Sequence, residues 1–285
     1  MKNKKGLLII AAAIVFGAGC QKMDRPALGD YPQDYTTTPT TPLRFYVPFD
    51  SADAEHRQIN KRFRDSISNY PSFFPNSNVK VVDGASRTAA SGGAVVYNNA
   101  NDFGASKSFT VAFWEKNTVP QNEPQWLFTL PSKDYWHNMA LTAFIDHQNT
   151  GSDQSVATVK LIFEDQWLEF TGVNKMPGNL LNNQWHHMAF VYDETTSKMT
   201  YYVDGHPLTG LPAGLTDVKK GGNPRGPAQF SKPVGFVVGG CTKHGGFGGP
   251  QDGWVQPWKG SMDQFRLYNK VLTDSEIQAL YSARM

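Results

Sequence analysis

The chain has 285 residues, a formal net charge of +2, 40% hydrophobic residues and 13% aromatic residues. This composition is ample for a packed core and excludes an intrinsically disordered chain. Lys and Arg are scattered rather than gathered in a basic stripe, so nucleic acid is not an expected partner.

The N-terminal segment has the pattern of an export signal. Three lysines among the first five residues precede an apolar stretch, residues 7–18, that is too short to span a bilayer. It ends in Gly17-Ala18-Gly19-Cys20, which resembles the lipobox of bacterial lipoproteins, where small residues precede a cysteine that is acylated. The prediction is a signal peptide over 1–19 and lipidation at Cys20, the alternative being ordinary cleavage that leaves a free thiol. Two acyl chains anchor a protein stably without spanning the membrane, so the expected location is the outer membrane or cell surface.

Residues 21–42 are polar and rich in turn-forming residues, and they end in Thr36-Thr37-Thr38-Pro39-Thr40-Thr41-Pro42. Together with Cys20 they are predicted to form a flexible linker that holds the following domain away from the membrane. Cys241 is the other cysteine. With Cys20 lipidated, no intramolecular disulfide can form, and stability must come from the core or from a metal.

From residue 43 onward, segments rich in β-branched and aromatic residues alternate with Gly, Asn, Asp and Pro clusters, which is typical of an antiparallel sandwich. Asp204-Gly205 is a hairpin turn signal, because a type I′ turn needs positive φ at both central residues. Thr273 and Glu276 have capping-box spacing and predict a C-terminal helix. One all-β domain over 43–285 is therefore expected, with strands at 43–49, 94–97, 108–114, 125–130, 139–146, 156–163, 167–171, 185–192, 199–204, 234–239 and 261–268.

Four stretches carry a family resemblance: Phe49-Asp50, SFTVAFW at 108–114, QWHHMAFVYD at 184–193 with YVDG at 202–205, and GSMDQFRLYN at 260–269. In this order they resemble the laminin-G-like branch of the concanavalin-A-like lectin/glucanase superfamily. The resemblance implies a jelly-roll sandwich of two antiparallel sheets that binds ligands on its concave face or loop rim. The superfamily includes lectins, adhesion modules and glycoside hydrolases, so the resemblance is specific for fold and less so for function. Trp114 and Trp185 are expected in the core.

The same resemblance implies a structural calcium ion that ties the first strand to the closing strand. Its candidate ligands are Asp50 and Asp263, which stand at matching motif positions, with Asp65 a weaker candidate. Hard carboxylate oxygens suit calcium. A salt-bridged or solvated aspartate is the alternative for each.

A catalytic reading centres on the acidic segment 164–169, which superficially resembles the catalytic strand of retaining β-glucanases. Glycoside hydrolysis needs two carboxylates about 5 to 10 Å apart. Glu164 and Glu169 are separated by an odd number of residues, so on a continuous strand they project from opposite faces. A turn at Asp165-Gln166 between two strands explains the segment better than catalysis does.

Two loops combine aromatic and hydrogen-bonding residues, the mixture that a sugar ring requires. One is the segment 134–138, and the other is the Gly-rich segment 239–258, in which Trp258 is expected in the core. The predicted ligand-binding residues are Trp136, His137, His244, Asp252 and Trp254.

These observations predict a cell-surface carbohydrate-binding lipoprotein that captures a polysaccharide or other glycan without cleaving it. A protein-binding adhesion or scaffold module with surface protein partners shares all these features and is one alternative. A glycoside hydrolase of the same superfamily is the other, since a sandwich active site can be assembled from distant loops.

Overall fold

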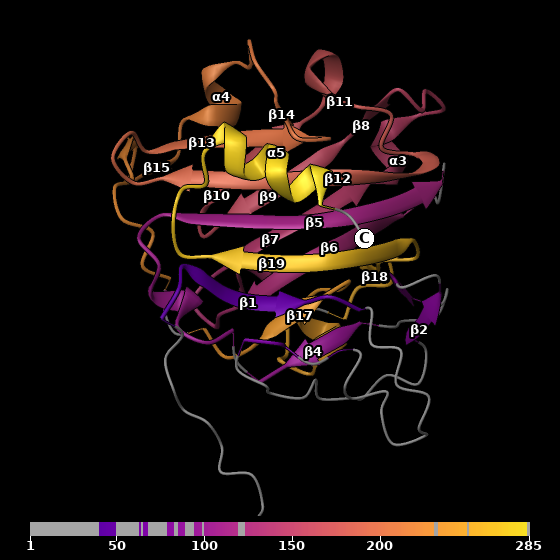
Figure 1. Cartoon of the computed structure of the whole chain (residues 1–285), viewed down its shortest axis with the longest axis horizontal. Coiled ribbons are helices and arrows are strands. Elements are labelled where there is room, and N and C mark those ends of the chain that lie inside the picture. The colour runs from indigo at the N-terminus through magenta and orange to yellow at the C-terminus, as the bar shows by residue number, and fades with distance from the viewer. Residues whose placement is uncertain are drawn as a thin grey trace, which may run out of the picture. The chain divides into compact units, whose positions relative to one another are not determined.

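The computed structural model describes residues 40–49, 63, 65–67, 79–82, 85–88, 94–98, 100–118, 123–230, 233–249 and 251–283. Residues 37–285 form one compact unit. Most of its residues in regular structure are in β-strands that form two packed antiparallel sheets, a jelly-roll sandwich (Figure 1). The predicted fold class is confirmed.

The first sheet pairs the earliest strand of the domain with the last. Strand β1 (Leu43–Val47) runs antiparallel to β19 (Ser261–Tyr268), with Val47 opposite Phe265. This pairing joins two segments that are far apart in the sequence. The order of the remaining strands is β14 (His206–Pro207), β13 (Lys198–Val203), β12 (Asn182–Asp193), β5 (Phe109–Thr118), β19, β3 (Ala85–Thr88) and β2 (Val79–Val82).

The second sheet lies behind the first in Figure 1. Its strand order is β10 (Gln166–Phe170), β9 (Val159–Phe163), β7 (Met139–Asp146), β6 (Pro124–Pro131), β17 (Phe236–Val238) and β4 (Val95–Tyr97). The short strand β18 (Gln256–Pro257) runs parallel to β6 and is the exception to the antiparallel pattern. Two small ribbons are β8 (Val156–Ala157) with β11 (Met176–Pro177), and β15 (Lys219–Lys220) with β16 (Asn223–Pro224).

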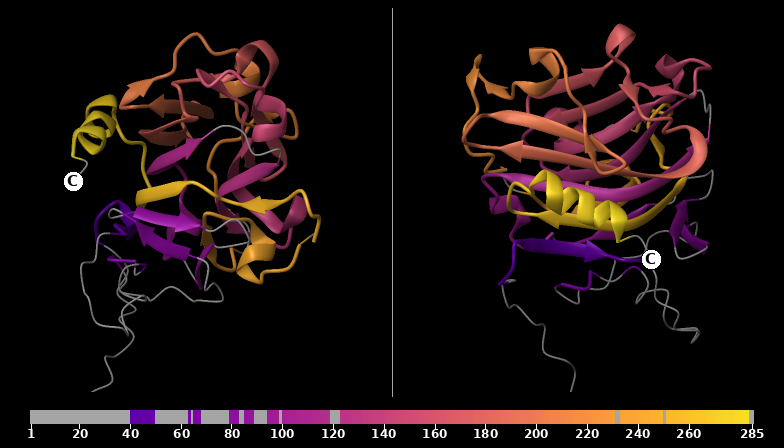
Figure 2. Two further views of the ribbon diagram at one scale, coloured as in Figure 1. Left: turned by 90° about the vertical axis from the view of Figure 1, so that its right-hand side faces the viewer. Right: turned by 45° about the horizontal axis from the view of Figure 1, so that its top comes forward.

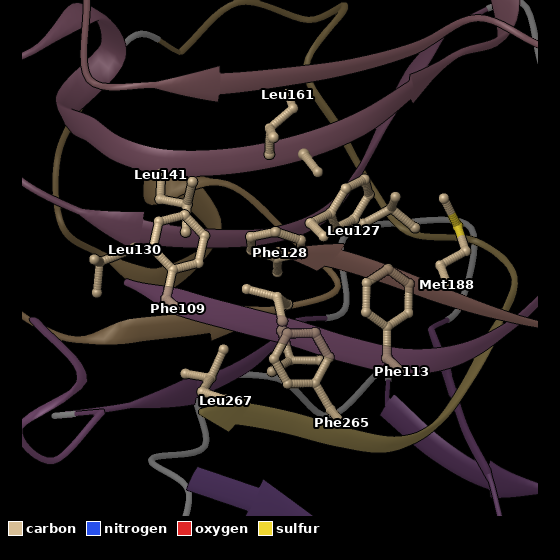
Figure 3. Close-up of a cluster of buried hydrophobic side chains, with 14 of the residues drawn as sticks. Phe109, Phe113, Leu127, Phe128, Leu130, Leu141, Leu161, Met188, Phe265 and Leu267 are labelled. Atoms are coloured by element: carbon tan, nitrogen blue, oxygen red, sulfur yellow. The ribbon is translucent and has the colours of Figure 1, made fainter. Parts of the chain in front are cut away.

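Phenylalanine and leucine side chains meet in the core between the sheets (Figure 3). Phe113 of β5 stacks on Phe265 of β19 with ring centroids 5.3 Å apart, and Phe128 of β6 approaches both rings from the opposite sheet. Fully burying one such side chain contributes about 1.5–3 kcal/mol. Within the described residues Cys241 is a free thiol, so a core of this kind holds this part of the sandwich together without a disulfide.

The outer face of the first sheet is covered by helix α5 (Asp274–Ser282), which lies in front of β5 and β12 in Figure 1 and outside both sheets in the left panel of Figure 2. Ile277 is fully buried against Ala189 and Val191. The predicted capping box is present, since Thr273 accepts a hydrogen bond from the backbone of Glu276. Both faces of β12 are therefore buried from His186 to Tyr192. Trp114 is buried as predicted, whereas Trp185 is only half-buried at the start of β12.

The predicted strand over 156–163 is two strands, because Thr158 leaves the ladder to bond the turn before it. Its hydroxyl donates to the Asn149 carbonyl oxygen at 3.0 Å, and its backbone N–H donates to Thr150 Oγ1 at 3.0 Å. These two residues belong to the short helix α3 (His147–Thr150). The other short helical segments are α4 (Ala213–Thr216), η1 (Phe103–Ala105), η2 (Trp136–Asn138), η3 (Gly172–Asn174) and η4 (Thr242–Gly245). Within the described part of the chain, no helix is long and apolar enough to cross a bilayer.

Candidate functional site

The outer face of the second sheet carries a set of side chains separate from the main core. Because side chains alternate along a strand, the residues between the core positions point outward. The strand register aligns them in two rows. One row runs Trp167, Ile162, Thr142 and Thr129, and the neighbouring row runs Glu169, Lys160, Phe144 and Trp126.

Two loops fold over this face and are joined to it by hydrogen bonds. Thr129 Oγ1 lies 2.8 Å from Thr142 Oγ1 and donates to the Gly240 carbonyl oxygen at 2.9 Å. Thr242 Oγ1 of η4 donates to the His137 carbonyl oxygen of η2 at 2.8 Å. The predicted loops 134–138 and 239–258 therefore meet each other over the sheet.

Gly249 explains why the second loop is rich in glycine. Its φ is +91°, and a Cβ there would lie 2.7 Å from Thr242 Oγ1 and 3.0 Å from the His137 carbonyl oxygen. Only glycine allows both this backbone conformation and this close approach. Gly249 therefore packs closely against the neighbouring loop at the His137 carbonyl oxygen.

Six aromatic side chains form a closed ring of contacts beneath and between the loops. Trp126 and Phe144, stacked with centroids 4.3 Å apart, are the buried floor on the sheet. From Trp254 the contacts pass to His137, Trp136 and Trp167, with centroid distances of 6.0, 3.4 and 4.8 Å. Trp167 and Trp254 then contact the floor at 6.4 Å to Phe144 and 5.8 Å to Trp126.

The tryptophans in this ring of contacts differ in exposure: Trp126 on the floor is buried, and the other three are exposed. Trp136, Trp167 and Trp254 are 39%, 37% and 41% exposed, and they are the exposed ones among the seven tryptophans of the chain. Exposed indoles cost hydration free energy unless a partner covers them. Their gathering on one face makes it a candidate binding surface, which we call the aromatic site: Trp136, His137, Trp167 and Trp254 over Trp126 and Phe144.

The backbone at His137 is strained. His137 and Asn138 have φ of 51° and 58°, the left-handed region that costs non-glycine residues free energy. The Asn138 backbone holds this turn, donating to the Tyr135 carbonyl oxygen at 2.9 Å and accepting from Ser132 N–H at 2.8 Å. Burial lowers the pKa of His137 and the nearby Asp252 carboxylate opposes this shift. The ring is therefore uncharged at neutral pH, with one donor and one acceptor.

His244 occupies a different role from His137 in this geometry. Its Nδ1 accepts from Cys241 N–H at 3.0 Å, completing a capping box at the start of η4. Burial, and then the Lys243 charge, lower its pKa to about 4, while a hydrogen bond to the Val255 backbone opposes the shift. Both ring nitrogens are thus engaged by loop backbone, so His244 braces the loop that carries Trp254.

Charged groups border the aromatic site at two places. Lys160 bonds Asp146 Oδ2 at 3.0 Å and Glu169 Oε1 at 3.3 Å, so one ammonium is shared by two carboxylates next to Phe144. Near His137, Asp252 is exposed, and its carbonyl oxygen accepts from Lys243 Nζ at 2.5 Å.

Sequence reasoning placed Trp136, His137, Asp252 and Trp254 in two loops, and the structure brings these loops together. It missed Trp167, Trp126 and Phe144, because their strands were interpreted as sandwich layers. Trp258 is fully buried, as predicted.

The acidic segment 164–169 forms a hairpin between β9 and β10, as expected, but the turn residues are Glu164 and Asp165 and not Asp165-Gln166. Gln166 pairs with Phe163, and Glu164 takes the left-handed conformation at φ 55°. Arg225 donates hydrogen bonds to both carboxylates, and the Glu164 side chain is only 2% exposed. These acids stabilise the turn.

The proposed calcium ligands are only partly within the described residues. Asp50, like the lipidation residue Cys20, lies outside them. Asp263 is buried on β19. Asp65 accepts hydrogen bonds from the backbone N–H groups of Tyr46 and Ile67 at 2.8 and 3.1 Å, which ties it to β1. In the part of the chain that the structure describes, no three His, Cys, Asp or Glu side chains are grouped to hold a metal.

Comparison with known proteins supports this fold. Residues 89–225 match the family model of the concanavalin A-like lectin/glucanases superfamily. A search of the curated proteins finds no match.

Two solved structures share the fold at low identity. Sialidase of Trypanosoma rangeli in complex with sialic acid has a TM-score of 0.52 and 17% identity, with 86% of this chain and 33% of that chain covered. This chain therefore spans about a third of the sialidase. Domain 4 of AbnA, a GH43 extracellular arabinanase from Geobacillus stearothermophilus, in complex with arabinotriose, has a TM-score of 0.52 and 17% identity, with 84% and 98% covered. Their likeness to this chain shows a shared sandwich fold, and both of these solved structures are complexes with a carbohydrate.

Proposed function

We propose that this chain captures a glycan at the aromatic site without cleaving it. The observation that carries this proposal is the row of three exposed tryptophans, with the uncharged His137 between Trp254 and Trp136 and with Trp167 next to Trp136. Indole faces pack against the apolar C–H faces of sugar rings, while an imidazole and nearby polar groups can bond the hydroxyls. The arabinotriose complex of domain 4 of AbnA, which has the same fold, is in keeping with such a role.

Binding without turnover is proposed from the arrangement of the nearby acids. Hydrolysis needs two carboxylates facing each other across a glycosidic bond. Asp146 and Glu169 are both bound to Lys160, so the ammonium occupies the space that such a bond would need. Glu164 is buried with Arg225 at the β9–β10 turn. Neither arrangement fits a catalytic pair.

We also propose that the protein acts at the cell surface, anchored through Cys20. A lipid anchor followed by the linker 21–42 would present the aromatic site to extracellular polysaccharide. Capture next to the membrane would raise the local concentration of glycan for other surface proteins.

A glycan array, followed by a reducing-sugar assay on the strongest ligand, tests the proposal. We expect retained binding and no release of reducing ends. Release of reducing sugar would show that the protein hydrolyses the glycan and would contradict binding without cleavage. A blank array together with specific protein partners in a surface pull-down would favour an adhesion module and contradict glycan capture.

A further inference from the structure

The exposed part of the aromatic site is a row of stacking positions. Trp254 contacts His137, His137 contacts Trp136, and Trp136 contacts Trp167, so the indoles follow one another from the 239–258 loop to the edge strand β10. Each is exposed to a similar extent, between 37% and 41%. Such a row can engage successive rings of one ligand.

The ring planes are not parallel along this row. The interplanar angles are 79° between Trp254 and His137, 70° between His137 and Trp136, and 61° between Trp136 and Trp167. A flat crystalline polymer surface requires coplanar stacking faces. The 61° angle between the Trp136 and Trp167 faces instead fits a single chain whose rings can rotate about their linkages.

Charge near the row disfavours acidic sugars. At the β10 end, Lys160 is shared by Asp146 and Glu169, which leaves one negative charge in excess. At the loop end, the Asp252 carboxylate lies close enough to His137 to raise the pKa of its imidazole. The Lys243 ammonium is bound to the Asp252 carbonyl oxygen. The charges of Lys243 and Asp252 offset each other at the loop end, whereas a carboxylate on the ligand would meet like charge at the β10 end and be repelled.

We infer that the aromatic site takes a single, soluble, uncharged glycan chain of at least three sugar rings, placed on Trp254, Trp136 and Trp167. This inference rests on the proposed function and names its substrate class. Trp167 is then the outermost stacking position and determines the preferred chain length.

The first test is a set of immobilised oligosaccharides with one to six rings, taken from neutral arabinan, xylan, β-glucan, mannan and galactan. Polygalacturonate fragments and sialylated oligosaccharides serve as acidic probes, and crystalline cellulose and chitin as insoluble ones. The expected result is binding to a neutral series that strengthens at least tenfold from one ring to three. Equal affinity for one and three rings, or preference for an acidic or crystalline probe, would overturn the inference while leaving glycan binding intact. No binding to any probe would instead contradict the proposed function.

The second test assigns the third position by calorimetry on the preferred neutral series. Trp167→Ala should weaken binding of the trisaccharide at least tenfold and weaken binding of the disaccharide much less. Trp167→Phe, which keeps an aromatic face, should recover part of the loss if packing on Phe144 at 6.4 Å is preserved. Val271→Ala, at an exposed position away from this face, is the control. Equal losses for disaccharide and trisaccharide would show that Trp167 only supports the fold of the site.

Discussion

Arg225 offers a sharp test of how the acidic turn between β9 and β10 is held. Its guanidinium is hydrogen-bonded to Glu164 and Asp165 and lies 4.5 Å from the centroid of the Phe163 ring. The side chains of Arg225 and Glu164 are 1% and 2% exposed, whereas Asp165 is 56% exposed. The buried pair therefore dominates the energetics.

Arg225→Met would leave the Glu164 carboxylate buried without its partner. Breaking a buried pair in this way costs about 3–5 kcal/mol. For a domain of this size each kcal/mol lowers the melting temperature by about 2–4 °C, so a fall of about 10 °C is expected. Arg225→Met combined with Glu164→Leu should recover most of this loss, because apolar groups often replace a buried ion pair at no net cost.

Thermal unfolding of the single and double variants measures both effects. Lys198→Met is the matched control, since the Lys198–Asp217 pair is exposed and its loss should change the melting temperature far less. The reasoning would be refuted if Arg225→Met behaved like Lys198→Met. A double variant no more stable than Arg225→Met would refute it as well.

Three further predictions concern the anchor, the proposed metal and pH. Cys20→Ala should release the protein from membranes and abolish labelling with radioactive palmitate, and unchanged fractionation would contradict lipidation. Calcium bound by Asp50 and Asp263 at 100 times its Kd would add about 2.7 kcal/mol, so a chelator should lower the melting temperature, and equal melting in chelator and calcium would exclude the site. Burial, reinforced by Asp204, raises the pKa of Glu115 well above its usual value, so the folded state keeps a proton that the unfolded chain loses. The free energy of unfolding should then fall as the pH rises above the ordinary Glu pKa of about 4.3, and Glu115→Gln should flatten this fall. An unchanged slope in Glu115→Gln would assign the pH dependence to other groups.

The strands were predictable because local pattern and tertiary environment agree. Asp204 and Gly205 have φ of 51° and 80°, as the predicted type I′ turn needs, and Val203 pairs with His206 across it. Among the strands longer than two residues, β2 and β3 were missed, although Asp83-Gly84 between them is the same turn signal. The split at Thr158 could not be predicted, because it depends on hydrogen bonds to a turn eight residues earlier.

The site was only partly predictable for a related reason. Composition identifies the loops that carry Trp136 and Trp254, since aromatic residues in polar loops have no core to fill. Trp167 lies on strand β10. Sequence alternation alone does not reveal that two distant loops fold over the outer face of the sheet to which this strand belongs. His244 looked equivalent to His137 in sequence, and only its hydrogen bond to Cys241 distinguishes the two.

Glycan binding at the aromatic site is tested most directly by calorimetry on the best ligand from the array, using Trp136→Ala and Trp254→Ala. Losing a well-buried aromatic contact costs on the order of 2 kcal/mol at a binding hot spot, so each variant should bind at least tenfold more weakly. The melting temperature should hardly change, because both indoles are about two-fifths exposed. Trp185→Ala removes a half-buried indole from the other sheet and should leave affinity unchanged. Unaltered affinity in both site variants, or an equal loss in Trp185→Ala, would contradict glycan binding at the aromatic site.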